Sequence, residues 1–389
     1  MSFDFDREID RNGTASVKHD GRAAYFGTPD VLPMWVADMD FAAPAAVTRA
    51  LARRAAHPVY GYTFYPDSLY EALIGWLEKR HGWQVERDWI LMAPGVVPSL
   101  HAAVLAFTAP GAAVVVQPPV YFPFFSAVTD TGRKLALNPL RLENGRYGID
   151  FAHLERCAAD GARLLLLCSP HNPVGRVWTP DELRELLCIA RRHGMMVLSD
   201  EIHADLVYPG QRHTALATLT EAGDRLVTAI APSKTFNIPG LGLSCLIAPD
   251  PAQRAALRKV FATLALGHAN PFSIAAFEAA YREGEAWLDA LLVYLRGNRD
   301  FVAASLAEHV PGIRLIQPEG TCLLWLDCRG LGMNDAELKA FLVAKARVGM
   351  NPGTVFGAGG SGFMRLNIGA PRRVVTEALE RIRRALETA

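Results

Sequence analysis

The stretch RLLLLCSPHNPVGRVWTPDELRELLCIARRHGMMVLSDE, residues 163–201, decides the expected fold. It begins and ends with short apolar runs, each followed by turn-forming or acidic residues. Runs this short are typical of strands buried on both faces of a sheet. Between them, 179–194 offers Thr179 as an N-cap, Pro180 at the first helical position, an acidic first turn and a basic last turn. These signals predict a helix, and the stretch therefore predicts a strand–helix–strand unit.

The same texture continues on both sides of this unit. Further strand-like runs lie at 112–119, 225–234 and 242–249, and a helix-like stretch lies at 98–111. The alternation predicts an α/β fold with a mostly parallel central sheet and helices on both faces.

After Pro271 the pattern changes and predicts a smaller α+β domain. It consists of a long helical region at 272–310, strands at 322–330 and 362–369, and helices at 334–349 and 372–388. We expect a large domain at 46–280 and a small domain formed by 1–45 plus 281–389.

Composition excludes several classes of function. Lys+Arg and Asp+Glu are equal at 40 each in 389 residues, so net charge gives no reason to expect a nucleic-acid or membrane partner. No apolar run is long enough to span a membrane, and the acidic start MSFDFDREIDRNG does not resemble a signal peptide. The six cysteines form no C-x-x-C pair, so we expect buried thiols, no metal site and a cytoplasmic location.

Polar residues follow several predicted strands. Asn172, Asp200 and Lys234 each come after an apolar run, as does Tyr121, and the segment 93–103 joins a glycine-containing turn to a helix start. Taken singly, each residue has a structural explanation. The asparagine fits a turn, the aspartate fits an N-cap of the next segment, and the lysine fits an exposed position at the end of a strand. Ligands bind at the carboxyl ends of parallel strands, however, and pyridoxal 5′-phosphate (PLP) uses an amine, a carboxylate, an amide, an aromatic face and a phosphate site together.

Four motifs carry a resemblance to a known family. They are SPHNPVGRVW (169–178), LSDEIHADL (198–206), APSKTFNIPGL (231–241) and FMRLNIG (363–369). In order and spacing, the chain resembles over nearly its whole length a fold-type I PLP-dependent enzyme of the aminotransferase class I/II family.

The resemblance implies roles for particular residues. Lys234 is expected to form the Schiff base with PLP, Asp200 to pair with the ring nitrogen, and Arg365 to bind the substrate α-carboxylate through a bidentate pair. Tyr62 is expected to reach the phosphate of a neighbouring subunit, which implies a homodimer. The remaining predicted cofactor residues are Gly95, Val96, Val97 and Ser233 at the phosphate, Tyr121 on the ring face, and Asn172 and His203 at the ring O3′.

Three of these roles compete with structural explanations that the sequence leaves open. His203 is also explained as a cap at a strand end, Tyr62 as core packing, and Arg365 as the partner of a structural carboxylate. The motif GAGGSG (357–362) is interpreted as a loop, because it opens no helix and so lacks the context of a dinucleotide site.

Two features favour one reaction of the family. SVKHDGR (16–22) and LPMWVADMDF (32–41) resemble the cystathionine β-lyase (C–S lyase) branch, although His19 stands where we expect tryptophan. Gly242 stands where transaminases of the family commonly carry an arginine. The sequence therefore predicts cleavage of cystathionine or other cysteine S-conjugates to a thiol, pyruvate and ammonia, with 36–41 and 351–356 shaping the choice of side chain. An aminotransferase and a regulatory protein that keeps the PLP scaffold are the alternatives.

Overall fold

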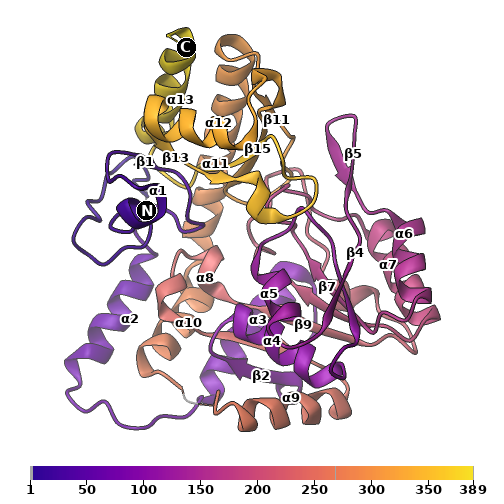
Figure 1. The fold of residues 1–389 in the computed structure, drawn as a ribbon. Coiled ribbons are helices and arrows are strands. Elements are labelled where there is room, and N and C mark those ends of the chain that lie inside the picture. The colour runs from indigo at the N-terminus through magenta and orange to yellow at the C-terminus, as the bar shows by residue number, and fades with distance from the viewer. Residues whose placement is uncertain (1–2, 268, 389) are drawn as a thin grey trace.

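The computed structural model describes residues 3–267 and 269–388 and is built around a seven-stranded sheet (Figure 1). Across this sheet the strands follow the order β2 (Ile90–Ala93), β10 (Ser244–Ile247), β9 (Leu226–Ile230), β8 (Met196–Asp200), β7 (Leu164–Cys168), β3 (Ala113–Val116) and β4 (Lys134–Leu137). Strand β10 pairs antiparallel with both of its neighbours, and the other pairings are parallel. The expected mostly parallel sheet is confirmed.

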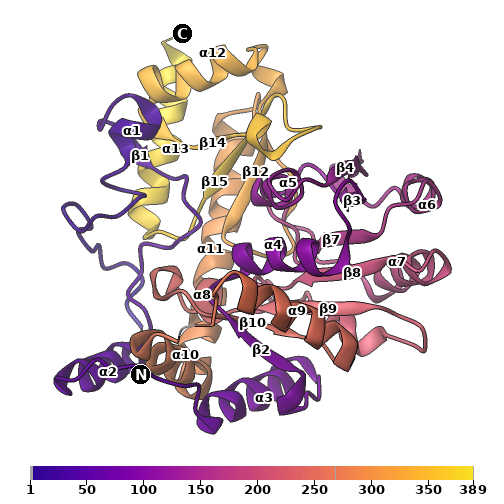
Figure 2. The same cartoon turned by 60° about the horizontal axis from the view of Figure 1, so that its bottom comes forward.

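Helices cover both faces of this sheet, as predicted (Figure 2). Alternate residues of β7 show why: Leu164 and Leu166 pack into one apolar cluster, while Leu165 and Leu167 pack into another. The first cluster includes α4 (Val96–Phe107), α5 (Pro123–Thr129) and α9 (Pro251–Thr263). The second includes α6 (Phe151–Ala159) and α7 (Pro180–Arg192). Both faces are therefore buried, as in other parallel sheets.

The strand–helix–strand unit forms as its local signals predict. Thr179 caps α7 in a capping box with Glu182, and Pro180 occupies the first turn. The helix returns the chain so that β8 lies beside β7, with Cys168 opposite Asp200 at the carboxyl ends of the two strands. Local capping thus fixes where α7 starts, and the pairing of β8 with β7 sets which residue reaches the end of the sheet.

A second, four-stranded sheet lies in the C-terminal part of the chain. Its order is β11 (Arg314–Leu315), β12 (Leu323–Asp327), β15 (Phe363–Asn367) and β14 (Asn351–Pro352). Helices α11 (Glu285–His309), α12 (Asp335–Ala340) and α13 (Arg372–Glu387) pack with it. The other helices and strands are α1 (Arg22–Phe26), β1 (Leu32–Pro33), α2 (Ala45–Ala56), α3 (Asp67–His81), β5 (Arg141–Glu143), β6 (Arg146–Gly148), α8 (Pro232–Thr235), α10 (Pro271–Glu283) and β13 (Val348–Gly349).

Two predicted helices differ from the structure. The region 272–310 is divided at Gly284 into α10 and α11, where a Cβ atom would collide with Ala280 O and the Phe236 ring. The helix predicted at 334–349 ends early: it widens into a π-helix over 341–346 and stops at Arg347, whose φ is 53°. Its last predicted residues instead form β13, which pairs with β1.

Helix α11 also contributes to two cores. Trp287 and Leu291 belong to the cluster that includes α3 and α10, whereas Val302 and Leu306 belong to the cluster beneath the second sheet. The domain boundaries expected at 45/46 and 280/281 remain predictions.

The exposure of the cysteines and the character of the helices can be compared with the expectations from composition. All six cysteines are free, and five of them are buried as expected, but Cys188 lies exposed on α7. Within residues 3–267 and 269–388, no helix combines the length and the apolar character needed to cross a membrane.

Candidate active site

A cavity of about 310 Å³ opens where the strands of the large sheet end. Asp200 is the last residue of β8, Cys168 is the last of β7, and Lys234 follows β9 on the short helix α8. The cavity brings together Gly95, Val96, Val97, Tyr121, Asn172, Asp200, His203, Ser233 and Lys234. A volume of this size suits a small cofactor. The predicted cofactor residues other than Tyr62 therefore share one site.

Lys234 is held in this cavity by its short helix. Pro232 starts α8 with its fixed φ, and Lys234 sits in the single turn that follows. Its Nζ donates a hydrogen bond of 2.8 Å to the carbonyl of Ala37. Burial lowers the pKa of the amine, because desolvation disfavours its charged form. The side chain is thus prepared to act as a neutral amine.

Asp200 lies buried with little to stabilise its charge. Burial raises the pKa of its carboxyl to about 7, and the neighbouring charge of Glu201 adds to the effect. The backbone N–H of Ile202 donates a hydrogen bond of 3.1 Å to it. In the part of the chain that the structure describes, no cation forms an ion pair with this carboxylate. A protonated ring nitrogen would supply one.

His203 presents an unused polar atom in the same site. Its Nδ1 is buried and has no hydrogen-bond partner among the described residues. Burial lowers the pKa of the imidazole to about 3, so the ring is neutral at physiological pH. Buried polar atoms are normally paired, so an orphan here indicates a missing ligand. A ring hydroxyl such as O3′ of PLP fits this requirement.

The turn between β2 and α4 has the geometry expected for the predicted phosphate contacts. Gly95 is the N-cap of α4 and has no side chain with which to cap the first backbone N–H groups. Such a helix start attracts phosphate through these N–H groups and the helix dipole. Ser233 and Gly242 line the cavity as well, and a Cβ at Gly242 would come within 2.9 Å of Pro94 O. The close approach of 242 to this turn leaves room there for little beyond glycine.

Arg365 lies beside the cavity on β15. Its guanidinium donates hydrogen bonds to Asn172 Oδ1 (3.0 Å), Trp35 O (2.9 Å) and Asn351 Oδ1 (2.8 Å). Burial lowers its pKa to about 10, so it stays charged near neutrality. None of the described carboxylates pairs with it, and its Nε is an orphan. The structural-carboxylate explanation therefore gains no support, and a substrate carboxylate fits.

The groups that orient this arginine have no clear signal in the sequence. Asn351 and Trp35 lie within or next to segments expected to shape substrate choice, but no role was assigned to either. One of the hydrogen bonds that Arg365 donates goes to the backbone carbonyl of Trp35, and a backbone carbonyl has no signature in the sequence. Cys168 also lines the cavity, and its apolar run indicated only burial. A search for polar residues paired across β14 and β15 would have found Asn351, which stands opposite Arg365.

Tyr62 is the predicted residue that the structure does not bring to the cavity. Its side chain is fully exposed, at 103% of the reference area. Core packing is excluded as its explanation. Val59, Tyr60 and Phe64 beside it are exposed too, so this segment presents an apolar surface to its surroundings.

Comparisons with known proteins agree with this geometry. The model of the family Aminotransferase class I and II matches residues 29–382. Cystathionine beta-lyase PatB of Bacillus subtilis (strain 168) is 45% identical over 99% of this chain and 100% of its own length. Cystalysin of Treponema denticola, solved with a pyridoxal 5′-phosphate cofactor, has a TM-score of 0.96 and 37% identity, with 100% of both chains covered. A PLP-bound putative aminotransferase from Clostridium difficile 630 has a TM-score of 0.97 and 40% identity, covering 99% of this chain and 100% of that one.

Proposed function

Because the chain belongs to the aminotransferase class I and II family, we propose that it is a PLP-dependent C–S β-lyase. It cleaves cystathionine or other cysteine S-conjugates to a thiol, pyruvate and ammonia. The observation that carries this choice within the family is the full-length similarity to a cystathionine beta-lyase. The cavity supports it, because an amine, a carboxylate and an anion site converge there.

The residues present fit PLP. The start of α4 and Ser233 would hold its phosphate, Tyr121 would lie against its ring, and Asn172 and His203 would bond its ring hydroxyl. Asp200 would keep a proton on the ring nitrogen, which relieves the unpaired burial of its carboxylate. When bound, PLP supplies an electron sink for the electron pair left on the substrate Cα.

The chain's own residues then do three things. Arg365 binds the substrate α-carboxylate and so fixes which bond at Cα faces the lysine. Lys234, whose pKa burial lowers, accepts the Cα proton at Nζ. The strand ends and Ala37 line the cavity in which these groups lie. Loss of the thiolate from Cβ follows from the charge that develops at Cα.

The proposal includes a homodimer with Tyr62 reaching the phosphate of the second subunit. Its support is the exposed apolar segment formed by Val59, Tyr60, Tyr62 and Phe64, which a second copy would cover. We also propose the large domain at 46–280 and the small domain from the remaining residues, with the site between them. A cytoplasmic location belongs to the same proposal and is supported by the six free thiols.

Incubation with cystathionine in the absence of a keto acid tests the reaction. A lyase releases pyruvate and thiol over many turnovers, whereas an aminotransferase stops after one half-reaction that leaves the cofactor in its amine form. The variant Lys234→Ala is expected to abolish turnover and to remove the long-wavelength absorbance of the bound cofactor. Turnover retained in that variant would overturn the whole assignment.

A further inference from the structure

Residues 34–41 (MWVADMDF), here called the strap, connect β1 to the segment before α2 and contact the site through their backbone. Ala37 O accepts a hydrogen bond from Lys234, and Trp35 O accepts one from Arg365. The two side chains with the most direct roles in the proposed reaction thus both bond the strap. Its position therefore determines where they point.

Asn367 holds the same segment from the side of β15. Its side-chain amide donates to the carbonyls of Val36 and Asp38. Asn237 adds a further tie, because its side chain bonds the backbone of Met39 in both directions. The strap therefore has few degrees of freedom on the side that faces the site.

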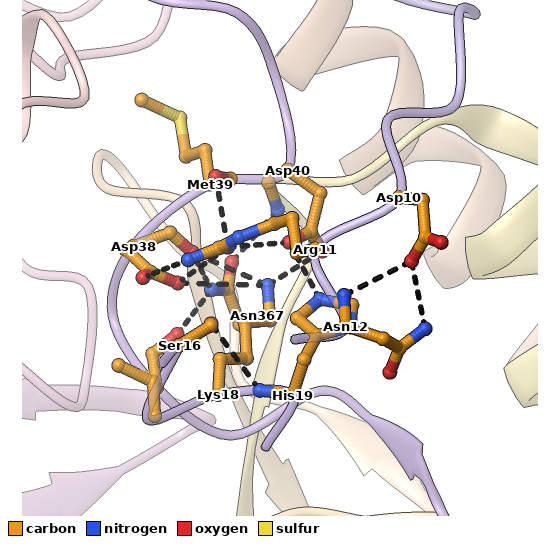
Figure 3. A network of polar contacts seen from close by, with 12 residues as sticks. Asp10, Arg11, Asn12, Ser16, Lys18, His19, Asp38, Met39, Asp40 and Asn367 are labelled. Carbon is orange, nitrogen blue, oxygen red and sulfur yellow. Dashed lines mark hydrogen bonds and ion pairs between the residues drawn. The ribbon is translucent and has the colours of Figure 1, made fainter. Parts of the chain in front are cut away.

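Its opposite side is held by charge, as Figure 3 shows. Asp38 and Asp40 point toward residues from the start of the chain. Arg11 forms ion pairs of 2.7 Å with both carboxylates, and Lys18 Nζ lies 2.7 Å from Asp40 Oδ2. His19 Nε2 is 3.1 Å from the other oxygen of Asp40. Two carboxylates are thus shared between the basic side chains of Arg11 and Lys18 and an imidazole.

Lys18 is the most deeply placed member of this cluster. Its side chain is 0% exposed, which is rare for a lysine and is tolerated only with a well-placed partner. It also donates to Asp38 O, and its own carbonyl accepts a hydrogen bond from the indole of Trp35. Lys18 is therefore tied to both the first and the last part of the strap. The solvent-exposed pair of Arg373 and Glu8 lacks such connections.

We propose that Lys18 is a positioning residue of the reaction: its buried ion pair with Asp40 fixes the strap, and the strap orients Arg365 and Lys234 toward the substrate. The inference deepens the proposed function and rests on it for the identity of the substrate. Arg11 supports the same contact from the partly exposed edge of the cluster. No contact between Lys18 and the reacting atoms is involved.

The test compares Lys18→Met, Lys18→Arg and the control Arg373→Met, each as the PLP-loaded enzyme. Losing the fixed carbonyl partner of Arg365 is worth about one hydrogen bond, so Lys18→Met is expected to weaken substrate binding roughly fivefold to tenfold. KM should rise by that factor, and kcat should also fall, because the strap orients the proton-accepting Lys234 as well. Hydrogen exchange at the amides of 34–41 should become faster. Lys18→Arg should restore part of both effects, and Arg373→Met should produce neither.

A second variant and a binding assay distinguish failure of the positioning role from failure of the proposed function. If Lys18→Met does not fold, Arg11→Gln is measured in its place, since Arg11 is the more exposed cation of the cluster. Unchanged KM with faster exchange in 34–41 would show a merely structural role and overturn the proposal. Binding of an unreactive amino acid, followed by cofactor absorbance, is measured for every variant. If the wild-type enzyme binds it but releases no pyruvate from cystathionine, the proposed function fails while the positioning role is still tested.

Discussion

Replacing Asp200 by asparagine is expected to stabilise the cofactor-free chain while abolishing its chemistry. The carboxyl group is buried, and burial raises its pKa to about 7 from an ordinary 3.8. An asparagine of nearly the same shape has no charge to desolvate, and its Oδ1 can still accept from Ile202 N–H. The residue that the reaction needs is thus one that folding disfavours.

The size and sign of the effect follow from linkage. A separation of about 3 pH units between folded and unfolded states corresponds to about 4 kcal/mol, at about 1.4 kcal/mol per pH unit. Because the folded state holds the proton more tightly, the wild-type chain loses stability as pH rises from about 4 to about 7. The advantage of Asp200→Asn is therefore absent below about pH 4, grows through that window and reaches up to about 4 kcal/mol above it.

Urea denaturation of the cofactor-free variants between about pH 4 and pH 8 measures this difference. Asp205→Asn is the matched control: burial opposes ionisation there too, but bonds from His81, Thr235 and Trp76 hold the pKa of its carboxyl below the ordinary value. That depressed pKa contributes stability above the unfolded pKa, and this stability is lost as pH falls. Asp205→Asn should therefore destabilise the chain near neutrality. A cofactor-free Asp200→Asn protein less stable than wild type at about pH 8 would refute the reasoning.

Two further predictions concern space and exposure. Gly242→Arg should displace the turn at Pro94 and weaken PLP affinity roughly fivefold to a hundredfold, from an overpacking cost of about 1–3 kcal/mol. The control is Gly240→Arg, because a Cβ at position 240 meets nothing within 4 Å. Absorbance titration measures PLP affinity, and equal affinities of the two variants would contradict the expected clash. A thiol reagent applied to the native protein should label Cys188 rapidly and the buried cysteines slowly. Mass spectrometry after brief labelling identifies the site, and Cys188→Ser should remove the fast label.

The large sheet and its helices could be predicted because their signals are local. The capping box of Thr179 and Glu182 fixes the start of α7, and apolar runs buried on both faces identify the strands. The missed end of the helix predicted at 334–349 has a distant cause. Residues 348–349 pair with Leu32 and Pro33, more than 300 positions earlier in the chain. No local pattern reports such a pairing, so helix propensity alone was a poor guide there.

The residues of the candidate site also divide into those with local signals in the sequence and those placed by distant contacts. Side chains at the ends of parallel strands were predicted, since the topology of such sheets gathers them at one edge. Residues 36–41 were expected to shape the substrate pocket, but the contacts of the strap were not predicted, because it acts through the carbonyls of Trp35 and Ala37. Its anchoring by Lys18 and Asp40 depends on tertiary placement of the first residues of the chain. Sequence reveals which side chains do chemistry more readily than what holds them in place.

The polar groups in the cavity make the cofactor-free fold less stable. Among the described residues, Asp200 has no cation as a partner, and His203 Nδ1 and Arg365 Nε have no hydrogen-bond partner; Lys234 is desolvated. Each raises the free energy of the cofactor-free fold, and each is a group that PLP or a substrate carboxylate would satisfy. Ligands that bind only the folded state stabilise it in proportion to RT ln(1 + [L]/Kd). The Asp200→Asn protein should therefore gain less stability from added PLP than wild type does, since one source of that coupling has been removed in advance.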